Sequence, residues 1–320
     1  MENSKLNRRK VLKTMAFGVI GASAATTWLH AAQPSSKSKR FLRVGIPFSY
    51  PATDPMAWAR KAKELQNKAV YVPEMSLDDK DYIRAIVTAV EENDLIFAEV
   101  GAWGTNLLDV DPDIRTKHIK TVSEKLALAE ELGAQCCVTL TGSYAKTWND
   151  PHPKNVSDES YDVTVENARK IIDAVKPKRT KLCFEMMGWT LPDSPDSQLK
   201  LIKAVDREAF GVHVDICNLI NSPDKFWNNT RLINEVFDKL GPWIVGAHAK
   251  DLRWVPWANV RFDECVIGEG AIDFATYLKR LIALDQDAPL MIEHMKNAEE
   301  YERCQQKIFE VGKAEGIEFA

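Results

Sequence analysis

Three carboxylates and one imidazole end four short apolar runs in the second half of the sequence. They are Glu185, Asp215, His248 and Glu293. Acids gathered in a poorly solvated site cannot all stay ionised without a compensating charge, which a divalent cation supplies. The oxygen and nitrogen donors suit Mn²⁺, Mg²⁺ or Co²⁺ at least as well as Zn²⁺, because no thiolate is among them. We therefore expect one divalent ion, Mn²⁺ first, if the four runs are strands whose ends meet.

Each of these residues also has a plainer interpretation when taken alone. Asp215 could cap a helix, Glu185 could pair with a lysine, and His248 could be a hydrogen-bonded core histidine. A shared site is favoured because four consecutive strand ends carry such residues, and strand ends of a barrel lie at one level.

Four further residues are candidates for the same site. His213 shares a strand face with the aspartate two residues later, and it either supports a metal ligand from behind or is interior packing. In a lyase it could be the extra catalytic acid or base. Lys250 could hold a substrate oxygen or form an ordinary ion pair with Asp251 or a neighbour. His152, in a loop between two prolines, is a candidate acid, base or substrate ligand. Glu99, near the end of another apolar run, is a pocket residue or an ion-pair partner.

Five tryptophans follow the predicted strands, in segments that would rim one mouth of a barrel. They are Trp103, Trp148, Trp189, Trp254 and Trp257. Aromatic faces stack on the C–H faces of sugars and exclude water, so we expect a carbohydrate-binding rim, with Trp103, Trp148, Trp189 and Trp254 foremost. The alternative is that these large side chains hold long loops down.

Short apolar runs alternate with amphipathic segments along the chain, which is typical of repeated strand–helix units. The predicted strands are Leu42–Pro47, Ala69–Val72, Leu95–Val100, Gln135–Leu140, Lys181–Met186, Phe210–Asp215, Ile244–His248 and Pro289–Glu293. The predicted helices are Pro55–Gln66, Leu77–Glu92, Pro112–Leu132, Glu159–Val175, Asp196–Val205, Asp224–Leu240, Phe274–Leu284 and Ala298–Glu315. Eight pairs predict an α/β fold of the (β/α)8 TIM-barrel type. A doubly wound sheet is the alternative, but no glycine-rich phosphate loop follows the first run.

The first 32 residues resemble an export signal of the twin-arginine type. Arg8 and Arg9 precede an apolar, small-residue stretch that is too short to span a bilayer. We expect residues 1–32 to be cleaved, 33–40 to be a linker, and 41–320 to form one barrel in the periplasm or otherwise outside the cytoplasm. An uncleaved anchor or an accidental basic start is the alternative. No later run of 18 apolar residues occurs, so no further membrane span is predicted.

The charge of the chain limits the classes of partner that it could bind. The chain has 320 residues, 28% of them charged, with a formal net charge of −4. Loss of residues 1–32, with five Lys/Arg and one acid, would make the charge −8. An acidic protein lacks the basic surface that nucleic acids require, so no nucleic-acid partner is expected. The six cysteines show no paired metal spacing, and most lie in or beside apolar runs, so we predict buried free thiols.

Several of these segments resemble the xylose-isomerase-like TIM-barrel family of sugar isomerases and epimerases. The pieces that carry the resemblance are Glu185, Asp215-x-x-Asn218, His248-x-Lys250-Asp251, Gly268-Glu269-Gly270-Ala271-Ile272-Asp273-Phe274 and Ile292-Glu293-His294. The resemblance covers about Leu42 to Ile317. It implies that Glu185, Asp215, His248 and Glu293 bind one divalent metal, and that the two glutamates transfer protons.

The resemblance and the residues together predict a metal-dependent isomerase or epimerase of an unphosphorylated sugar or polyol ketone. The main alternative is a keto-glycoside lyase or hydrolase, in which proton abstraction is followed by loss of a β-leaving group. A non-catalytic sugar-binding protein is a lesser alternative, and it would not need both glutamates. The related three-zinc DNA-repair nucleases are disfavoured, because the extra histidines that they need are missing. A homo-oligomer remains open.

Overall fold

The computed structural model describes residues 41–320, so the predicted signal peptide and linker lie outside the described residues. Eight parallel strands form one sheet in the order β1-β10-β7-β6-β5-β4-β3-β2. Their bounds are β1 (Val44–Gly45), β2 (Ala69–Tyr71), β3 (Ile96–Gly101), β4 (Cys136–Thr139), β5 (Lys181–Glu185), β6 (Phe210–Asp215), β7 (Ile244–Ala249) and β10 (Leu290–Ile292). Lys68 N donates to Val44 O at 2.9 Å across the ends of this order, so the barrel is nearly closed. The TIM-barrel prediction is confirmed, and the open doubly wound alternative is wrong.

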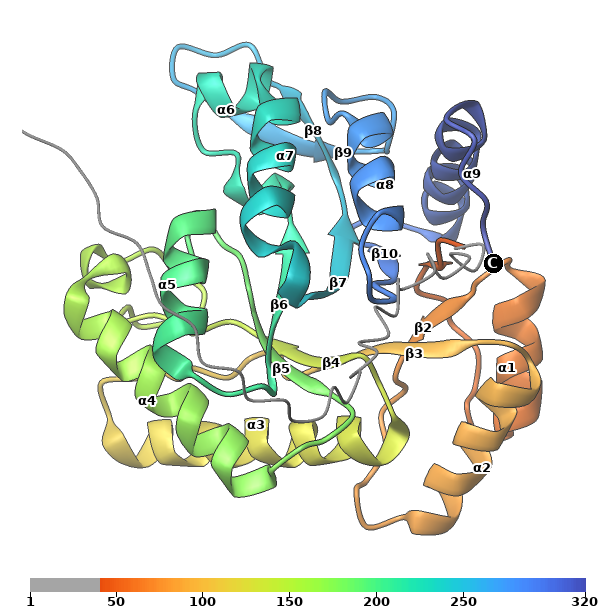
Figure 1. Ribbon diagram of the computed structural model, residues 1–320, viewed down its shortest axis with the longest axis horizontal. Coiled ribbons are helices and arrows are strands. Elements are labelled where there is room, and N and C mark those ends of the chain that lie inside the picture. Colours follow the sequence, from red (N-terminus) through yellow and green to blue (C-terminus); the bar gives the residue numbers. More distant parts are fainter. Residues whose placement is uncertain (1–40) are drawn as a thin grey trace, which may run out of the picture. The chain divides into compact units, whose positions relative to one another are not determined.

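Helices alternate with the strands and surround them (Figure 1). They are α1 (Pro55–Glu64), α2 (Lys80–Glu92), α3 (Pro112–Leu132), α4 (Asp158–Val175), α5 (Pro195–Val205), α6 (Pro223–Trp227), α7 (Asn229–Leu240), α8 (Phe274–Ile282) and α9 (Ala298–Ala314). Side-chain caps explain their starts, since Asp54 accepts from Ala57 N and Asp111 from Asp113 N. Gly133, with φ of 68°, ends α3 in the left-handed conformation that a side chain would strain.

Two features differ from the sequence prediction. The stretch 224–240 is two helices and not one, because the chain leaves helical geometry at Asn228 (φ −111°, ψ 34°). The side-chain amide of Asn229 bonds to backbone groups outside the helix. Its Nδ2 donates to Ala271 O and its Oδ1 accepts from Asp273 N. The second feature is an unpredicted antiparallel hairpin after β7, formed by β8 (Asp251–Trp254) and β9 (Phe262–Cys265).

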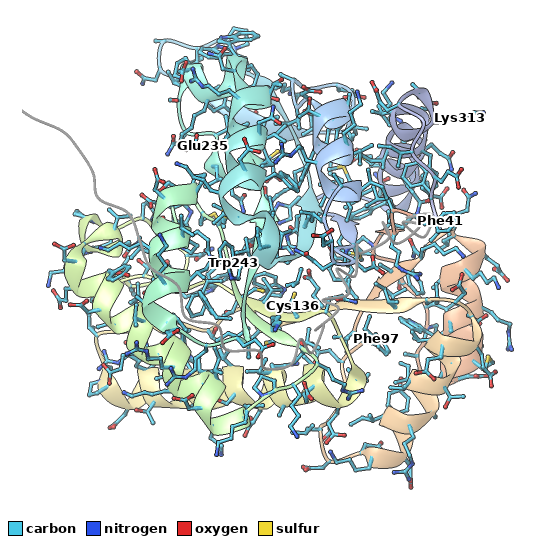
Figure 2. All side chains as sticks on the ribbon, in the orientation of Figure 1. Phe41, Phe97, Cys136, Glu235, Trp243 and Lys313 are labelled. Atoms are coloured by element: carbon cyan, nitrogen blue, oxygen red, sulfur yellow. The ribbon has the colours of Figure 1, made fainter. Side chains whose placement is uncertain are left out.

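The core follows from strands that are buried on both faces. Cys136 lies among the strands in Figure 2, whereas Glu235 and Lys313 lie on outer helices. All six cysteines are free and buried, as the sequence predicted. Within residues 41–320, no helix is both long and apolar enough to cross a membrane.

Candidate active site

The four residues that opened the sequence argument converge at one end of the barrel. Glu185 and Asp215 end β5 and β6, His248 is the penultimate residue of β7, and Glu293 directly follows β10. One ligand atom from each lies within 4.8 Å of the others. We call these four residues the acidic cluster. Parallel strands in register explain the convergence, since Asp215 pairs with His248 across β6 and β7.

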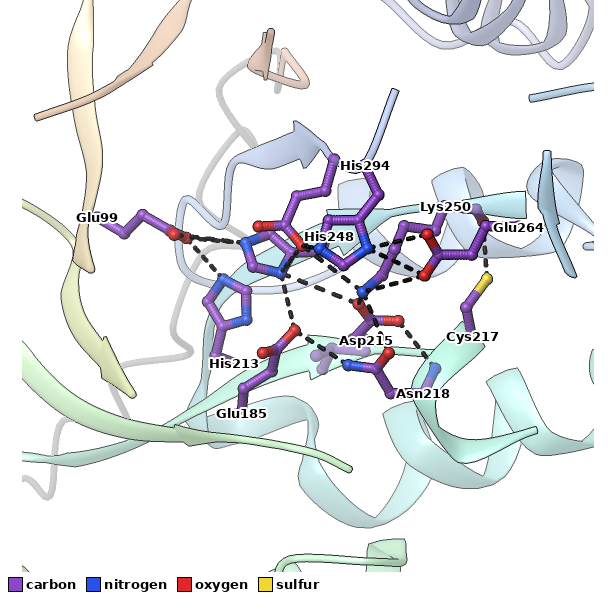
Figure 3. A network of polar contacts seen from close by, with 12 residues as sticks. Glu99, Glu185, His213, Asp215, Cys217, Asn218, His248, Lys250, Glu264 and His294 are labelled. Carbon is purple, nitrogen blue, oxygen red and sulfur yellow. Dashed lines mark hydrogen bonds and ion pairs between the residues drawn. The ribbon is translucent and has the colours of Figure 1, made fainter. Parts of the chain in front are cut away.

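One imidazole nitrogen faces all three carboxylates of the acidic cluster, and Figure 3 shows Glu185 and Asp215 beside His248. His248 Nδ1 lies 2.9 Å from Glu185 Oε1, 3.0 Å from Glu293 Oε2 and 3.9 Å from Asp215 Oδ2. A single N–H cannot satisfy three carboxylates, whereas a cation among them can contact each donor. The donor set therefore fits a divalent ion with oxygen and nitrogen ligands.

Burial and the neighbouring charges shift the pKa values of the acidic cluster. Burial raises the pKa of Asp215 and of Glu293 above their usual values. Burial also raises the pKa of Glu185, but the hydrogen bond and charge of His248 outweigh it and bring the pKa to about 2. Burial alone lowers the pKa of His248, yet the charges of Glu293 and Glu99 raise it well above its usual range.

Lys250 supplies a buried positive charge at the same point. Its Nζ lies 2.7 Å from Asp215 Oδ2 and 3.6 Å from Glu293 Oε2, and it donates to Asn218 Oδ1 at 3.1 Å. Burial lowers the pKa of Lys250, but the neighbouring carboxylates, Asp215 foremost, raise it above its ordinary value. The expected alternative, an ion pair with Asp251 or a neighbour, is met by a neighbour: Lys250 pairs with Asp215, whereas Asp251 binds backbone groups.

Asp251 holds together the segment that leaves the site and the segment that returns to it. Its carboxylate accepts backbone hydrogen bonds from Leu252, Gly268, Gly270 and Ile272, at 2.9 to 3.1 Å. A Cβ on Gly270 would lie 2.1 Å from Asp251 Oδ1, so glycine is required there. The two motifs of the family resemblance, His-x-Lys-Asp and Gly-Glu-Gly-Ala-Ile-Asp, therefore form one structural unit.

Glu99 and His213 lie behind the acidic cluster. Glu99 Oε2 is 2.8 Å from His213 Nε2 and 3.3 Å from His248 Nε2, and the two imidazole rings are 4.1 Å apart. The positive charges of both imidazoles lower the pKa of Glu99 against the opposite effect of burial. Both side chains are fully enclosed and contact His248. His213 thus has the position expected of a residue that supports a metal ligand, and Glu99, expected in the pocket or in an ion pair, pairs with the two histidines.

The remaining predicted residues do not join the acidic cluster. His152 Nδ1 accepts from Lys154 N, which caps the short helical turn Pro153–Val156. Trp254 packs against Phe226 and Phe262, and Trp257 is 74% exposed. Trp103 is exposed, and Trp148 and Trp189 are half-buried.

A cavity of about 400 Å³ lies beside Glu293, on the side of β1 and β2. None of the five predicted tryptophans lines it. Its aromatic wall consists of Phe48, Tyr50, Trp58, Tyr71 and Tyr301. We call this hollow the aromatic cavity. Trp58 lies on α1, so a search for tryptophans in loops after strands could not find it.

Two residues that the sequence argument did not place in the site are Glu264 and His294. Glu264 lies on β9, and its Oε2 is 2.9 Å from His294 Nδ1 and its Oε1 4.0 Å from Lys250 Nζ. Glu264 gave no signal because its strand was not predicted. His294 belonged to the closing motif of the resemblance but received no role.

No curated protein matches the sequence. Solved structures with the same fold include a xylose isomerase-like protein from Mycobacterium smegmatis in complex with magnesium (18% identity, TM-score 0.58, 86% of this chain and 96% of that chain). Others are a 3-keto-D-glucoside 4-epimerase from E. coli (14%, 0.59, 84% and 99%) and a D-psicose 3-epimerase from Clostridium cellulolyticum with D-tagatose (15%, 0.62, 85% and 99%).

A family model described as "Xylose isomerase-like TIM barrel" matches residues 60–308, which is most of the chain. The match includes the whole acidic cluster, the hairpin and the unit built on Asp251. This chain therefore belongs to the xylose isomerase-like TIM barrel family.

Proposed function

We propose that this protein is a metal-dependent isomerase or epimerase that removes a proton next to the carbonyl of an unphosphorylated sugar or polyol ketone. The observation that carries the proposal is the acidic cluster, in which two glutamates at the ends of different strands approach the same nitrogen of one imidazole. Several proteins of the same fold are described as sugar epimerases, which supports this class of reaction.

Glu185, Asp215, His248 and Glu293 would hold the ion, with Mn²⁺ as first choice. When bound, a divalent ion polarises a carbonyl and stabilises negative charge on its oxygen. Asn218 orients Glu185 by donating from Nδ2 to Oε1 at 3.1 Å. Lys250 neutralises part of the acidic charge, because its ammonium group lies beside Asp215 and Glu293. From there it would donate to an oxygen of a sugar bound at the acidic cluster.

The two glutamates would move the proton. One carboxylate takes it from the carbon beside the carbonyl, and the other returns a proton to the opposite face. Glu185 is buried and the Glu293 side chain is only 16% exposed, which limits the access of competing water to that proton. Two groups on opposite faces favour inversion at that carbon, which is epimerisation.

Replacing Glu293 by glutamine tests the assignment. We expect Glu293→Gln to reduce turnover by roughly 10²- to 10⁴-fold, because an amide cannot exchange the proton. Sugar affinity should persist, as measured by calorimetry with Mn²⁺ present. Glu74→Gln, an exposed carboxylate outside the cluster, is the matched control. Unaltered turnover in Glu293→Gln would contradict the catalytic role. If the unsubstituted, Mn²⁺-loaded protein binds sugars but turns none of them over, that result would support the sugar-binding alternative.

A keto-glycoside lyase or hydrolase is the second candidate, because the aromatic cavity adjoins Glu293 and offers room for a leaving group. Incubation in D₂O separates the two reactions. Deuterium that enters a free ketose without bond cleavage supports epimerisation, and release of the aglycone from a 3-keto-glycoside supports the lyase.

We further propose that residues 1–32 direct export by the twin-arginine route. The paired arginines before a short apolar stretch support this. Replacing Arg8 and Arg9 by lysine should retain the protein in the cytoplasm, as cell fractionation would detect. Export of the double variant at the normal level would contradict the proposal.

A further inference from the structure

The aromatic cavity lies to one side of the acidic cluster. Glu293 forms part of its wall, whereas Glu185, Asp215 and His248 do not line it. Its volume of about 400 Å³ is that of a ligand pocket, for which roughly 300–1,000 Å³ is usual. A sugar whose carbonyl lies at the acidic cluster would thus have an adjoining hollow next to it.

The walls of the aromatic cavity indicate the chemistry of its occupant. The rings of Phe48 and Trp58 pack with centroids 5.3 Å apart, and Tyr50 stands at the edge, 41% exposed. Such faces bind rings that have an apolar face, either the C–H face of a pyranose or an aryl group. Neither lysine nor arginine is among the lining residues. His294, the basic side chain on this wall, already pairs with Glu264 at 2.9 Å. A neutral occupant is therefore favoured over one that carries a phosphate group.

Tyr71 marks the inner end of the aromatic cavity. Tyr71 on β2 pairs in register with Glu99 on β3. Because paired residues of neighbouring strands point to the same side of a sheet, the Tyr71 side chain points into the barrel, as that of Glu99 does. The hydroxyl is buried and has no hydrogen-bond partner among the described residues. Burial raises the pKa of Tyr71, and the charges of Glu293, Glu99 and Glu185 raise it further, so the hydroxyl keeps its proton and can donate it. Buried hydroxyls are seldom left without a partner, so this one is available to a ligand.

We propose that the aromatic cavity is a second subsite, which binds a neutral ring joined to the reacting sugar, and that the substrate is therefore a glycoside. The inference rests on the proposed function for the position of the reacting sugar. Tyr71 donates to an oxygen at or near the linkage between the two rings, and the aromatic wall stacks on the second ring.

Affinity measurements on the full-length, Mn²⁺-loaded protein test the subsite without any need for turnover. The probes are glucose, phenyl β-D-glucopyranoside and cellobiose. We expect both two-ring probes to bind more tightly than glucose. Tyr50→Ala should weaken the two-ring probes by roughly 3- to 10-fold and leave glucose unchanged. Trp257→Ala, which removes an exposed aromatic outside the cavity, is the matched control and should change neither.

Tyr71→Phe provides an independent readout. It should weaken the two-ring probes by roughly 2- to 12-fold through loss of one hydrogen bond. The free protein should be no less stable, because the hydroxyl has no partner to lose.

Each outcome decides the matter. Preference for the phenyl probe assigns the subsite to an aryl group, and preference for cellobiose assigns it to a sugar. Equal affinity for one-ring and two-ring probes, or equal losses for glucose in Tyr50→Ala, would overturn the subsite. The proposed function fails separately, through normal turnover in Glu293→Gln, so the two failures are distinguishable.

Discussion

The two sides of the barrel mouth are built differently. On the side of β5, β6, β7 and β10, charged groups lie within hydrogen-bonding distance of one another, and backbone register fixes them. On the side of β1 and β2, the strands are only two and three residues long, and aromatic side chains from loops, β2, α1 and α9 enclose a hollow. The first side supplies reactive groups at fixed positions, and the second supplies space and an unused hydroxyl.

The contrast teaches how to separate chemistry from selectivity in this fold. A reactive group must be held to a fraction of an ångström, so it belongs on a strand. A wall that accepts a ring needs only shape and an apolar face, so loops and helices suffice. Glu293 stands at the border, since it belongs to the acidic cluster and also lines the aromatic cavity.

Metal removal should have the largest effect and should act through the acidic side. Chelation is expected to abolish proton exchange, because the three carboxylates and His248 then repel or pair with one another without a cation. Added Mn²⁺ should restore it and K⁺ should not, as deuterium incorporation from D₂O would report. Full exchange after exhaustive chelation would show that the acidic cluster works without an ion.

Loss of the buried ammonium should have the next largest effect, this time on stability. Lys250→Met leaves Asp215 and Glu293 without their buried counter-charge, so we expect about 3–5 kcal/mol less free energy of unfolding in the metal-free protein. Urea unfolding measures it. Lys170→Met, at an exposed pair with Glu166, should cost about 0–1 kcal/mol.

On the aromatic side, Tyr50→Ala should cost little stability, because that ring is largely exposed. Equal losses in Lys250→Met and Tyr50→Ala would remove the distinction between the two sides.

A smaller effect than that of Lys250→Met is expected in the unit that supports the acidic side from behind. Asp251→Asn keeps the shape but turns an amide N–H₂ toward backbone N–H donors, so we expect about 1.5–3 kcal/mol of destabilisation. The affinity for Mn²⁺ should fall together with the stability. In the Asp251→Asn background, Tyr50→Ala should still weaken the binding of the phenyl glucoside. Asp206→Asn, at an exposed helix end, is the control. A selective loss of aromatic-side binding would contradict the division.

The sequence sufficed for the barrel and for the convergence of four residues, for a physical reason. Parallel strands buried on both faces are continuous apolar runs, and their ends must meet at one level. Phe210–Asp215 was predicted residue for residue.

The ion-pair partners of side chains and the directions in which they point were harder to predict from the sequence. Lys250 has carboxylates on several sides, and three-dimensional distance, not adjacency to Asp251, decides its pair. The β8–β9 hairpin has short strands that alternate weakly, so Glu264 escaped notice. A tryptophan after a strand can face the mouth or pack away from it, as Trp254 does.

The carboxylate of Asp251 also makes the hairpin a loop closed at its neck. Leu252, where the chain leaves, and Gly268, where it returns, bind the same side chain, while the tip at 255–261 lies beyond it. Changes of length or sequence at the tip are therefore insulated from the metal-ligand candidates. That makes the tip a natural place to attach a label, a tether or a whole inserted domain without disturbing the reactive groups.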